Sequence, residues 1–284
     1  MAFKDKLQAH LKDSLTENKL ELLPSGFQTL GKVVIIKLKP ELMPHKEKIA
    51  EAYLDLLPYI RSIYINKGII EGQYRTPKGI EYLAGEKDPI VQHKEHGVIY
   101  EFDITKIMFS QGNLRERKYL STLVNDGEVV VDMFAGIGYF SLPIGKLSSP
   151  QKVYSIELNP LAYKFLVKNI KLNKLEDIVI PIKGDCKKEV IKLSKAGIQA
   201  DRVVMGVFPA PVEYIEEALT LLKPEGTIYH FEGVVDQDNY LELFEQFNFI
   251  AKKKDINCEL KEKRFVKSYG PNLYHTVLDI QASK

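Results

Sequence analysis

The sequence contains few of the residues that mark metalloproteins, secreted proteins or membrane proteins. Its 284 residues include two cysteines and no tryptophan. Cys186 and Cys258 lie far apart and form no Cys-x-x-Cys pair, which argues against a zinc site or a disulfide framework. We therefore expect no metal site. The sequence has no run of roughly 18 apolar residues, so we expect no segment to span a membrane.

The net charge excludes few classes of protein. The sequence has 40 Lys and Arg residues and 38 Asp and Glu residues, which leaves a net charge of +2. A balance so close to zero neither indicates nor excludes a nucleic-acid partner. The N-terminal stretch has mixed charge and lacks the apolar core of a secretion signal, so we expect a cytoplasmic protein. The chain length suits two domains or one large one.

The stretch 129–159 has the pattern of a βαβ nucleotide-binding unit. An apolar β-branched run ends on Asp132 and leads into a turn that contains Gly136 and Gly138. A helix-like segment and a second apolar run follow, and Glu157 ends that run roughly 20 residues after the turn. Glycines let the backbone approach a ligand closely, and a carboxylate at this distance can accept hydrogen bonds from ribose hydroxyls.

The glycine turn does not match a dinucleotide fingerprint completely. Ser141 occupies the position, three residues after Gly138, where that fingerprint has a third glycine. A phosphate group is therefore less favoured here than an adenosine ligand without phosphates. A structural βαβ turn that binds nothing is the alternative.

Apolar runs alternate with helix-like segments from about residue 113 to the end, which predicts a Rossmann-like α/β domain in residues 113–284. We expect seven strands in a mostly parallel sheet with helices on both faces, at Val129–Asp132, Val153–Ile156, Ile178–Ile182, Arg202–Met205, Thr227–Phe231, Phe249–Cys258 and Tyr274–Ile280. The short connection between the last two predicts an antiparallel hairpin. Because ligands in such sheets lie beyond the carboxyl ends of the strands, we expect Asp132, Glu157 and Asp185 to share one rim.

The first part of the chain predicts an N-terminal amphipathic helix in residues 1–24 and a smaller α+β domain in residues 25–112. Apolar residues recur at near-helical spacing from Phe3 to Leu20. A helix is expected at 44–57, and the strands expected in one mixed sheet are Val33–Leu38, Ile63–Ile65, Gly79–Leu83 and Val98–Phe102. Another helix should begin near Leu114, with Ser110 or Asn113 as its cap.

The segment Asp132–Phe140, DMFAGIGYF, resembles motif I of class I S-adenosylmethionine-dependent transferases. It is similar to the archaeal and eukaryotic enzymes that modify the guanosine 3′ of the tRNA anticodon, at position 37. Two activities share the pattern: the tRNA guanine-N1 methyltransferase and the wybutosine-pathway 3-amino-3-carboxypropyltransferase. The segments GKVVIIKL, GQYRTP, HKEHGVIYEFDITK and RFVKSYGPNLYHTVLDI resemble the same enzymes, so the resemblance covers most of the chain.

This resemblance implies S-adenosylmethionine as the cofactor. The segment Phe109–Arg117, FSQGNLRER, is similar to a pattern that lies against the methionine part of the cofactor in these enzymes. Arg117 suits the methionine carboxylate because a guanidinium forms a bidentate contact, and a solvated helix face is the alternative. The cofactor-binding residues that we expect are Ser110, Arg117, Phe134, Gly136, Gly138, Glu157, Leu158, Asp185 and Cys186.

Three of the expected site residues have alternative roles. The Asp185 carboxylate would accept the adenine amine, beside the Cys186 backbone amide, or would cap the helix that follows it. Arg75 and Glu116 match positions that the methyltransferases use in proton chemistry, so the resemblance implies catalytic roles for both. For attack by a ring carbon they would instead orient the substrate, and a phosphate or surface contact is the alternative for Arg75.

The segment after the fourth strand bears on which group is transferred. The tRNA guanine-N1 methyltransferases read Asn-Leu-Pro there, whereas this chain has Gly206 in place of the asparagine. The absence of that hydrogen-bonding side chain favours aminocarboxypropyl transfer, although Phe208-Pro209 is closer to the methyltransferase pattern. Those methyltransferases usually carry an additional small N-terminal domain that has no counterpart in this sequence, which favours the same activity.

We therefore predict transfer of the 3-amino-3-carboxypropyl group to a ring carbon of 4-demethylwyosine at position 37 of tRNA(Phe), by a monomer. A methyltransferase that acts at position 37 is the main alternative, and a non-catalytic RNA-binding protein is a distant one. Lysines and aromatic residues in 252–254 and 261–274 suit an RNA backbone and its bases. Such charge runs are more often solvated surfaces, and Glu259 and Glu262 dilute this one.

Overall fold

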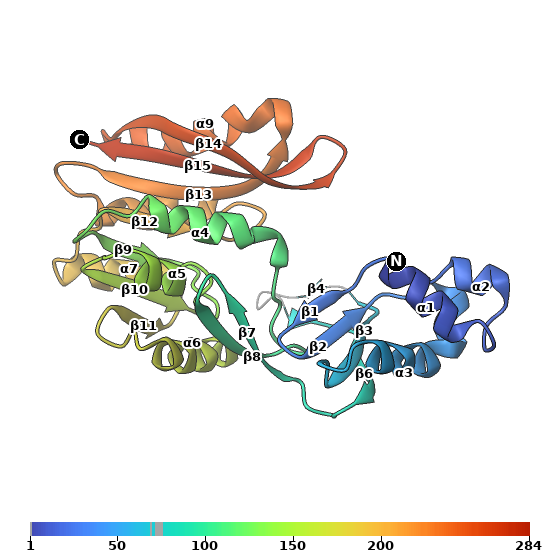
Figure 1. Cartoon of the computed structure of the whole chain (residues 1–284). Helices are drawn as coiled ribbons and strands as arrows, with labels where there is room; N and C mark the ends of the chain where they lie inside the picture. Colours follow the sequence, from blue (N-terminus) through green and yellow to red (C-terminus); the bar gives the residue numbers. More distant parts are fainter. Residues whose placement is uncertain (1, 69, 72–75) are drawn as a thin grey trace. The chain divides into compact units, whose positions relative to one another are not determined.

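The computed structural model describes residues 2–68, 70–71 and 76–284 (Figure 1). The chain divides into two compact units, and each is described by itself. The first comprises residues 1–94 and 100–109, and the second comprises residues 95–99 and 110–284.

The first unit is built on a four-stranded sheet of order β1-β2-β3-β6. Its strands are β1 (Gln28–Leu30), β2 (Val33–Ile36), β3 (Ser62–Asn66) and β6 (Ile80–Gly85). β2 and β3 are parallel, and the other two pairs are antiparallel. The parallel pair is connected through η1 (Pro40–His45) and α3 (Lys46–Leu56). Apolar residues of α3 and of the strands form one buried core with Leu7 and Leu11.

The single N-terminal helix that we predicted is wrong. The chain forms two short helices, α1 (Phe3–Leu11) and α2 (Glu17–Glu21). Between them the Leu11 carbonyl accepts hydrogen bonds from the amides of Ser14 and Leu15, which closes a turn and buries Leu15. The apolar spacing therefore continues across a break in the helix.

Two further pairs of strands lie outside the four-stranded sheet. The placement of Val98–Phe102 in that sheet is wrong, because β8 (Val98–Asp103) forms a separate two-stranded sheet with β7 (Ile90–Glu95). β4 (Ile70–Glu71) and β5 (Thr76–Pro77) form a short antiparallel pair.

The second unit contains the predicted seven-stranded, mostly parallel sheet, in the order β11-β10-β9-β12-β13-β15-β14. The strands are β9 (Val129–Asp132), β10 (Lys152–Glu157), β11 (Val179–Lys183), β12 (Arg202–Met205), β13 (Thr227–Asp236), β14 (Asn257–Gly270) and β15 (Leu273–Ser283). The first five are parallel, and β15 is antiparallel to its two neighbours. This arrangement confirms the α/β class and the C-terminal hairpin.

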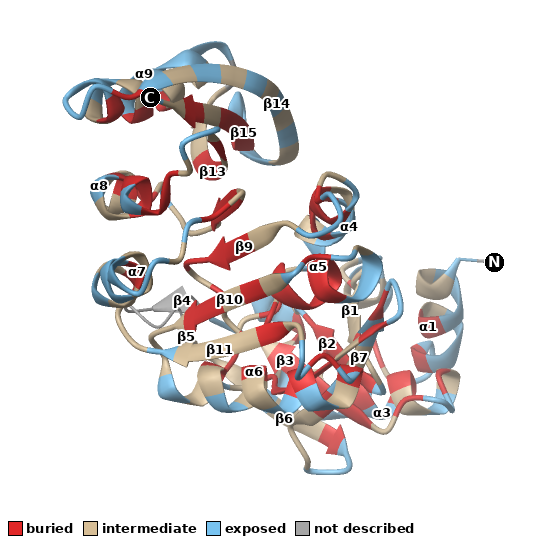
Figure 2. Ribbon diagram, turned by 90° about the vertical axis from the view of Figure 1, so that its left-hand side faces the viewer, coloured by how far each residue is buried: buried red, intermediate tan, exposed pale blue. Residues whose placement is uncertain are grey.

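Helices flank this sheet on both faces. Its α-helices are α4 (Leu114–Thr122), α5 (Ser141–Leu147), α6 (Pro160–Asn173), α7 (Cys186–Lys195), α8 (Ile215–Ala218) and α9 (Tyr240–Lys252). Figure 2 shows α4 and α5 on one face and α7 and α8 on the other, with buried strands between them. The 3-10 turns are η2 (Gln111–Asn113), η3 (Val212–Tyr214), η4 (Leu219–Leu221) and η5 (Gln237–Asn239).

The predicted sixth strand is misplaced. Residues 249–252 belong to α9, and the strand begins only at Asn257. Leu243, Phe247 and Ala251 are buried at a spacing of four, which is the period of a helix and not of a strand. The predicted segment therefore joined the end of a helix to the start of β14.

Two phenylalanines of α9 test this placement. The Phe247 ring is fully buried, with its centroid 5.2 Å from that of Tyr229 and 5.4 Å from that of Phe231, whereas Phe249 is 63% exposed. We expect Phe247→Ala to lower the free energy of unfolding by about 3–5 kcal/mol. Phe249→Ala, its matched control, should change it by less than about 1 kcal/mol. Urea denaturation measures both, and equal losses would contradict the helix.

Candidate functional site

Three acidic residues lie at one rim of the second unit's sheet, as predicted. Asp132 is the last residue of β9, Glu157 is the last residue of β10, and Asp185 follows β11. These strands are parallel neighbours, so their carboxyl ends meet at the same edge.

Backbone amides from two segments hold the Glu157 carboxylate. The amide of Gly136 donates to Oε2 at 2.7 Å, and the amide of Asn159 donates to Oε1 at 2.6 Å. Burial raises the pKa of Glu157, and the hydrogen bonds from the backbone oppose this rise. Each carboxylate oxygen has a second lone pair, so Glu157 keeps acceptor capacity for ribose hydroxyls.

The two glycines of the turn are required by the fold itself. Gly136 has a φ of +58°, and an added Cβ would lie 2.5 Å from the Tyr139 ring. Gly138 has a φ of +98°, and its added Cβ would lie 2.5 Å from Leu142 Cγ. Positive φ and the neighbouring side chains therefore account for both glycines without a ligand. Close approach of a cofactor to this turn stays a prediction.

Ser141, which occupies the position of the missing third glycine, holds Asp132. Its hydroxyl donates to Asp132 Oδ2 at 2.6 Å and accepts from Ser155 at 2.8 Å. Asp132 is 1% exposed. Burial raises its pKa to about 6, against the opposing hydrogen bonds from Ser141 and the Phe134 amide. Sequence reasoning missed this bond, because it noted Ser141 only as a departure from a motif.

Asp185 takes the capping role. Its carboxylate accepts from the Lys187 amide at 2.9 Å at the start of α7, and contact with an adenine stays a prediction. Asn159 caps α6 in the same way. Cys186 begins α7 as a buried free thiol, and burial raises its pKa to about 12, so the thiol stays protonated at neutral pH.

Two other expected cofactor contacts lie at the same rim. Phe134 follows β9, and its ring packs edge-on against Tyr214 with 5.0 Å between centroids. Leu158 lies between the end of β10 and the Asn159 cap of α6. Both positions are beyond strand ends, where the predicted cofactor would lie.

Arg117 is buried in α4, so the interpretation of its side chain as part of a solvated face is wrong. It is 3% exposed, its Nη2 lies 2.6 Å from Glu95 Oε2, and its Nη1 donates to the Ser110 carbonyl at 2.9 Å. Lys267 Nζ donates to the Ser110 hydroxyl at 3.1 Å. The sequence did not indicate Glu95 or Lys267 as partners of this segment. Contact between Arg117 and a cofactor carboxylate stays a prediction.

The start of α4 agrees with the prediction, but its capping does not. The helix begins at Leu114, yet neither Ser110 nor Asn113 makes a side-chain capping bond. Instead, the short 3-10 turn η2 leads into the helix, and the Leu114 amide donates to the Gln111 carbonyl.

Glu116 of α4 is bound by a largely buried arginine. Arg264 of β14 donates to Glu116 Oε1 through Nε at 3.0 Å and through Nη2 at 2.9 Å. Its Nη1 also lies 2.7 Å from Asp279 Oδ2 of β15. Arg264 lies within the stretch 261–274 that we interpreted as an RNA surface, but its side chain is 14% exposed and its guanidinium pairs with Glu116, Asp279 and Glu262.

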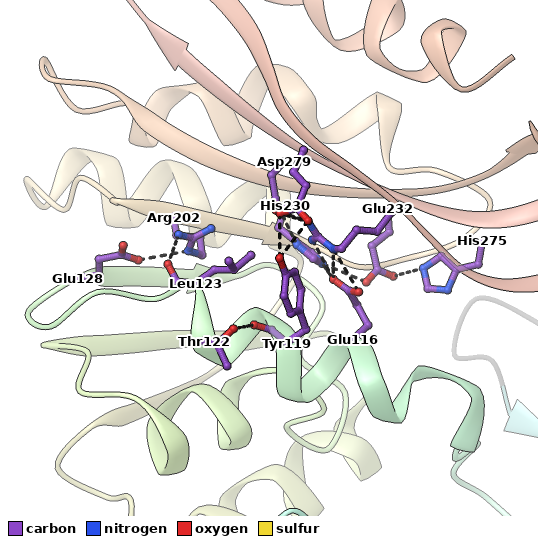
Figure 3. A network of polar contacts seen from close by, with 12 residues as sticks. Glu116, Tyr119, Thr122, Leu123, Glu128, Arg202, His230, Glu232, His275 and Asp279 are labelled. Atoms are coloured by element: carbon purple, nitrogen blue, oxygen red, sulfur yellow. Dashed lines mark hydrogen bonds and ion pairs between the residues drawn. The ribbon is translucent and has the colours of Figure 1, made fainter. Parts of the chain in front are cut away.

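Buried histidines continue this network across β13 and β15. His230 Nδ1 lies 3.0 Å from Asp279, its Nε2 lies 3.3 Å from Glu232 Oε1, and Glu116 Oε1 lies 3.9 Å from the same nitrogen. His275 Nε2 lies 3.1 Å from Glu232 Oε2. Figure 3 shows these side chains converging from α4, β13 and β15. We refer to Glu116, His230, Glu232, Arg264, His275 and Asp279 as the ionic network.

The network fixes the charges of its members. Burial by itself lowers the pKa of His230, but hydrogen bonds to Asp279 and Glu232 outweigh it and raise the pKa to about 9. Burial by itself raises the pKa of Glu232, but hydrogen bonds from His230 and His275 lower it to about 2. The Asp279 pKa is lowered because the His230 and Arg264 contacts outweigh burial. His230 is therefore a cation at neutral pH, and both acids are anions.

The remaining expected residues bear on the substrate. Arg75 lies outside the described residues. On β14 the Phe265 and Tyr269 rings are 36% and 48% exposed, and Lys263 Nζ lies 5.0 Å from the Phe265 ring.

Within the described ranges no three His, Cys, Asp or Glu side chains are placed to hold a metal ion, and no helix is long and apolar enough to cross a membrane.

Comparison with known families places the chain. Residues 91–260 match the model of the TRM5/TYW2 methyltransferase domain, and residues 7–88 match that of the TYW2 N-terminal domain. The chain belongs to the TRM5/TYW2 family. The tRNA(Phe) (4-demethylwyosine(37)-C(7)) aminocarboxypropyltransferase of Pyrococcus horikoshii is 37% identical, over 99% of this chain and 98% of that protein.

Solved structures of the family agree with this assignment. The P. horikoshii TYW2 structure in complex with MeSAdo has a TM-score of 0.84 at 34% identity and covers 99% of this chain and 100% of that one. Trm5b of Pyrococcus abyssi has a TM-score of 0.80 at 30% identity, over 95% of this chain and 79% of that one. The same Trm5b is a tRNA (guanine(37)-N(1))-methyltransferase by name.

The pKa values in the ionic network predict how stability depends on pH. Folding raises the pKa of His230 from 6.5 to about 9, so its contribution is complete below pH 6.5 and is lost as the pH rises through 9. Folding lowers the pKa of Glu232 from 4.5 to about 2, so its contribution is complete above pH 4.5 and is lost as the pH falls through 2. We expect the free energy of unfolding to decrease by roughly 1–3 kcal/mol between about pH 6.5 and 9.5.

Urea unfolding at a series of pH values measures this decrease. Asp279, Glu232, Glu116 and the Phe140 ring surround His230, so its imidazole is the titrating group in this region at alkaline pH. A His230→Gln variant should therefore show a flatter profile above pH 6.5. An NMR titration midpoint for His230 at its ordinary value would contradict the assignment.

Proposed function

We propose that this protein transfers the 3-amino-3-carboxypropyl group of S-adenosylmethionine to a ring carbon of 4-demethylwyosine at position 37 of tRNA(Phe). One observation carries the proposal: the model of the TYW2 N-terminal domain matches residues 7–88, beside the domain that TYW2 shares with TRM5. The P. horikoshii aminocarboxypropyltransferase, which is similar over nearly the whole of both chains, supports it.

The rim of the second unit has groups that suit the adenosine part of this cofactor. Glu157 keeps lone pairs for the ribose hydroxyls, and the Asp185 cap and the Cys186 amide lie at the next strand end. Arg117, held against Glu95, would approach the methionine carboxylate from the Ser110 segment. When bound, S-adenosylmethionine supplies a sulfonium with three attached carbons that a nucleophile can attack.

The space after β12 supports aminocarboxypropyl transfer over methyl transfer. A Cβ added to Gly206 would lie 2.9 Å from a Phe140 ring atom and 3.4 Å from Glu232 Cδ. The asparagine of the guanine-N1 methyltransferases therefore does not fit here unless these neighbours shift. Geometry decides which of the three carbons meets the nucleophile, so an altered site at this position is expected to alter the transferred group.

Glu116 is proposed to orient the acceptor base, which is the role expected of it when a ring carbon attacks. Arg264 fixes the Glu116 carboxylate through two donors, which sets its direction. Arg75 is proposed to orient the acceptor base, although it lies outside the described residues. We further propose that a single chain acts on each tRNA, at its anticodon loop, in the cytoplasm.

Mass spectrometry of tRNA tests the transferred group. Purified protein and S-adenosylmethionine are incubated with tRNA that carries 4-demethylwyosine and, as a control, with an unmodified transcript. We expect a gain of about 101 Da on the first RNA alone, because one aminocarboxypropyl group replaces one hydrogen. A gain of about 14 Da on either RNA would identify a methyltransferase instead. No gain on either would favour a non-catalytic RNA-binding protein.

Isothermal titration calorimetry tests the cofactor site directly. Glu157→Ala removes both acceptors for the ribose hydroxyls, so we expect S-adenosylmethionine to bind at least roughly 30-fold more weakly. Glu128→Ala is the matched control, because Glu128 forms an ion pair with Arg202 at the opposite, amino end of β9. Equal affinities for the Glu157→Ala variant and the unsubstituted protein would place the cofactor elsewhere.

A further inference from the structure

Glu232 is the buried carboxylate beside Gly206, where the parallel part of the sheet ends. Phe231 of β13 pairs with Met205, the last residue of β12, and the next residues along the two strands are Glu232 and Gly206. An added Cβ at Gly206 would lie 3.5 Å from Glu232 Oε2. Because Gly206 has no side chain, the backbone at this position directly faces the carboxylate.

Two imidazoles fix the position of this carboxylate. His230 contacts Oε1 at 3.3 Å and His275 contacts Oε2 at 3.1 Å, and all three side chains are at most 1% exposed. His230 is held in turn by Asp279, at 3.0 Å. Glu232 is therefore held in place away from solvent, and its effect on the reaction would come from the field of its charge.

Stability does not explain why this charge is buried. Taking a carboxylate out of water costs several kcal/mol, and apolar residues of the same volume are often at least as stable as a buried ion pair. The field of Glu232 reaches the rim. Burial is the main cause of the raised pKa of Asp132, and the charges of Glu157 and Glu232 raise this pKa further. A role of the Glu232 charge in the transfer step would explain why a carboxylate is buried at this position.

The reaction of the proposed function moves positive charge from the cofactor to the acceptor. The ring carbon forms a bond to the γ-carbon of the transferred group, the bond from that carbon to sulfur breaks, and its electron pair stays on the sulfur. The departing 5′-methylthioadenosine is neutral, so the charge passes to the base, which then releases the proton of the same ring carbon. A fixed anion nearer the acceptor than the sulfur stabilises this change.

We propose that Glu232, fixed by His230 and His275 beside Gly206, is a positioning residue that presents a fixed negative charge to the acceptor side of the transfer site. The inference rests on the proposed function. It adds a residue that touches neither reactant but favours the charge distribution of the transition state.

The test compares Glu232→Gln, which keeps the shape and removes the charge, with Glu128→Gln as the matched control. Glu128 is also a buried acid in an ion pair, with Arg202 at 3.2 Å, but it lies at the amino end of β9. Four quantities are measured for each: the single-turnover rate at saturating cofactor, the dissociation constant of S-adenosylmethionine, that of neutral 5′-methylthioadenosine, and the melting temperature.

We expect Glu232→Gln to slow single turnover by roughly 10- to 100-fold and to change both dissociation constants by less than about threefold. Glu128→Gln should lower the melting temperature without slowing turnover. Glu232→Asp, which keeps the charge, should recover most of the rate. If Glu232→Gln does not fold, His275→Gln is used in its place. This variant keeps the Glu232 carboxylate but removes one of its two hydrogen-bonding imidazoles, and it should slow turnover by at least roughly threefold.

Three results would overturn the inference. Turnover of Glu232→Gln equal to that of the unsubstituted protein would show that the charge is not used. Weaker binding of S-adenosylmethionine but not of 5′-methylthioadenosine would place the charge on the cofactor side. Equal slowing by Glu128→Gln would indicate a structural effect. Failure of the proposed function is separate, because it appears as a missing product of about 101 Da with the unsubstituted protein.

Discussion

The second unit depends on the way in which Arg264 pairs with two buried acids at once. Its guanidinium lies 2.9 Å from Glu116 and 2.7 Å from Asp279, which come from α4 and β15. Without Arg264 these carboxylates would face Glu232 with His230 as the nearest cation. Because an uncompensated buried charge costs far more than a paired one, this contact makes the C-terminal hairpin inseparable from α4.

The hairpin also reaches the segment that precedes α4. Glu262, Arg264 and Lys267 of β14 contact Tyr119, Glu116 and Ser110 respectively. Strict alternation would place Lys267 on the opposite face from Arg264, but an irregularity in the pairing between Phe265 and Lys267 inserts one residue. This bulge returns Lys267 to the face that carries the other two side chains. The same strand therefore contacts the whole segment from Ser110 to Tyr119.

The structural features that could be predicted are those formed by residues close together in the sequence. The parallel strands and the acids at their ends follow from local patterns, as does the Asn159 cap, because an apolar run, a turn and a polar end are all contained in 129–159. Ser141 could not be interpreted in this way, since its partner Asp132 is defined by the folded turn and not by spacing in the motif.

The ionic network could not be predicted, because its members are separated by long stretches of chain. Glu116 and Arg264 lie 148 positions apart, and His230 and Asp279 lie 49 apart. One local signal was nevertheless present: on β14 the positions of Glu262 and Arg264 alternate with those of Lys261 and Lys263, and only the second pair is exposed. The basic residues of this run suggested an RNA surface that Glu262 dilutes, whereas strand alternation separates a partly buried pair from an exposed pair.

This difference in predictability bears on how one fold supports two chemistries. The rim at 129–159 lies within the residues that match the TRM5/TYW2 methyltransferase domain. Beyond it lie Gly206, which has no side chain, and a carboxylate that is held by two histidines from β13 and β15. Under the proposed function, cofactor binding would thus depend on local sequence and the direction of transfer on long-range packing, so a change in the second would leave the first intact.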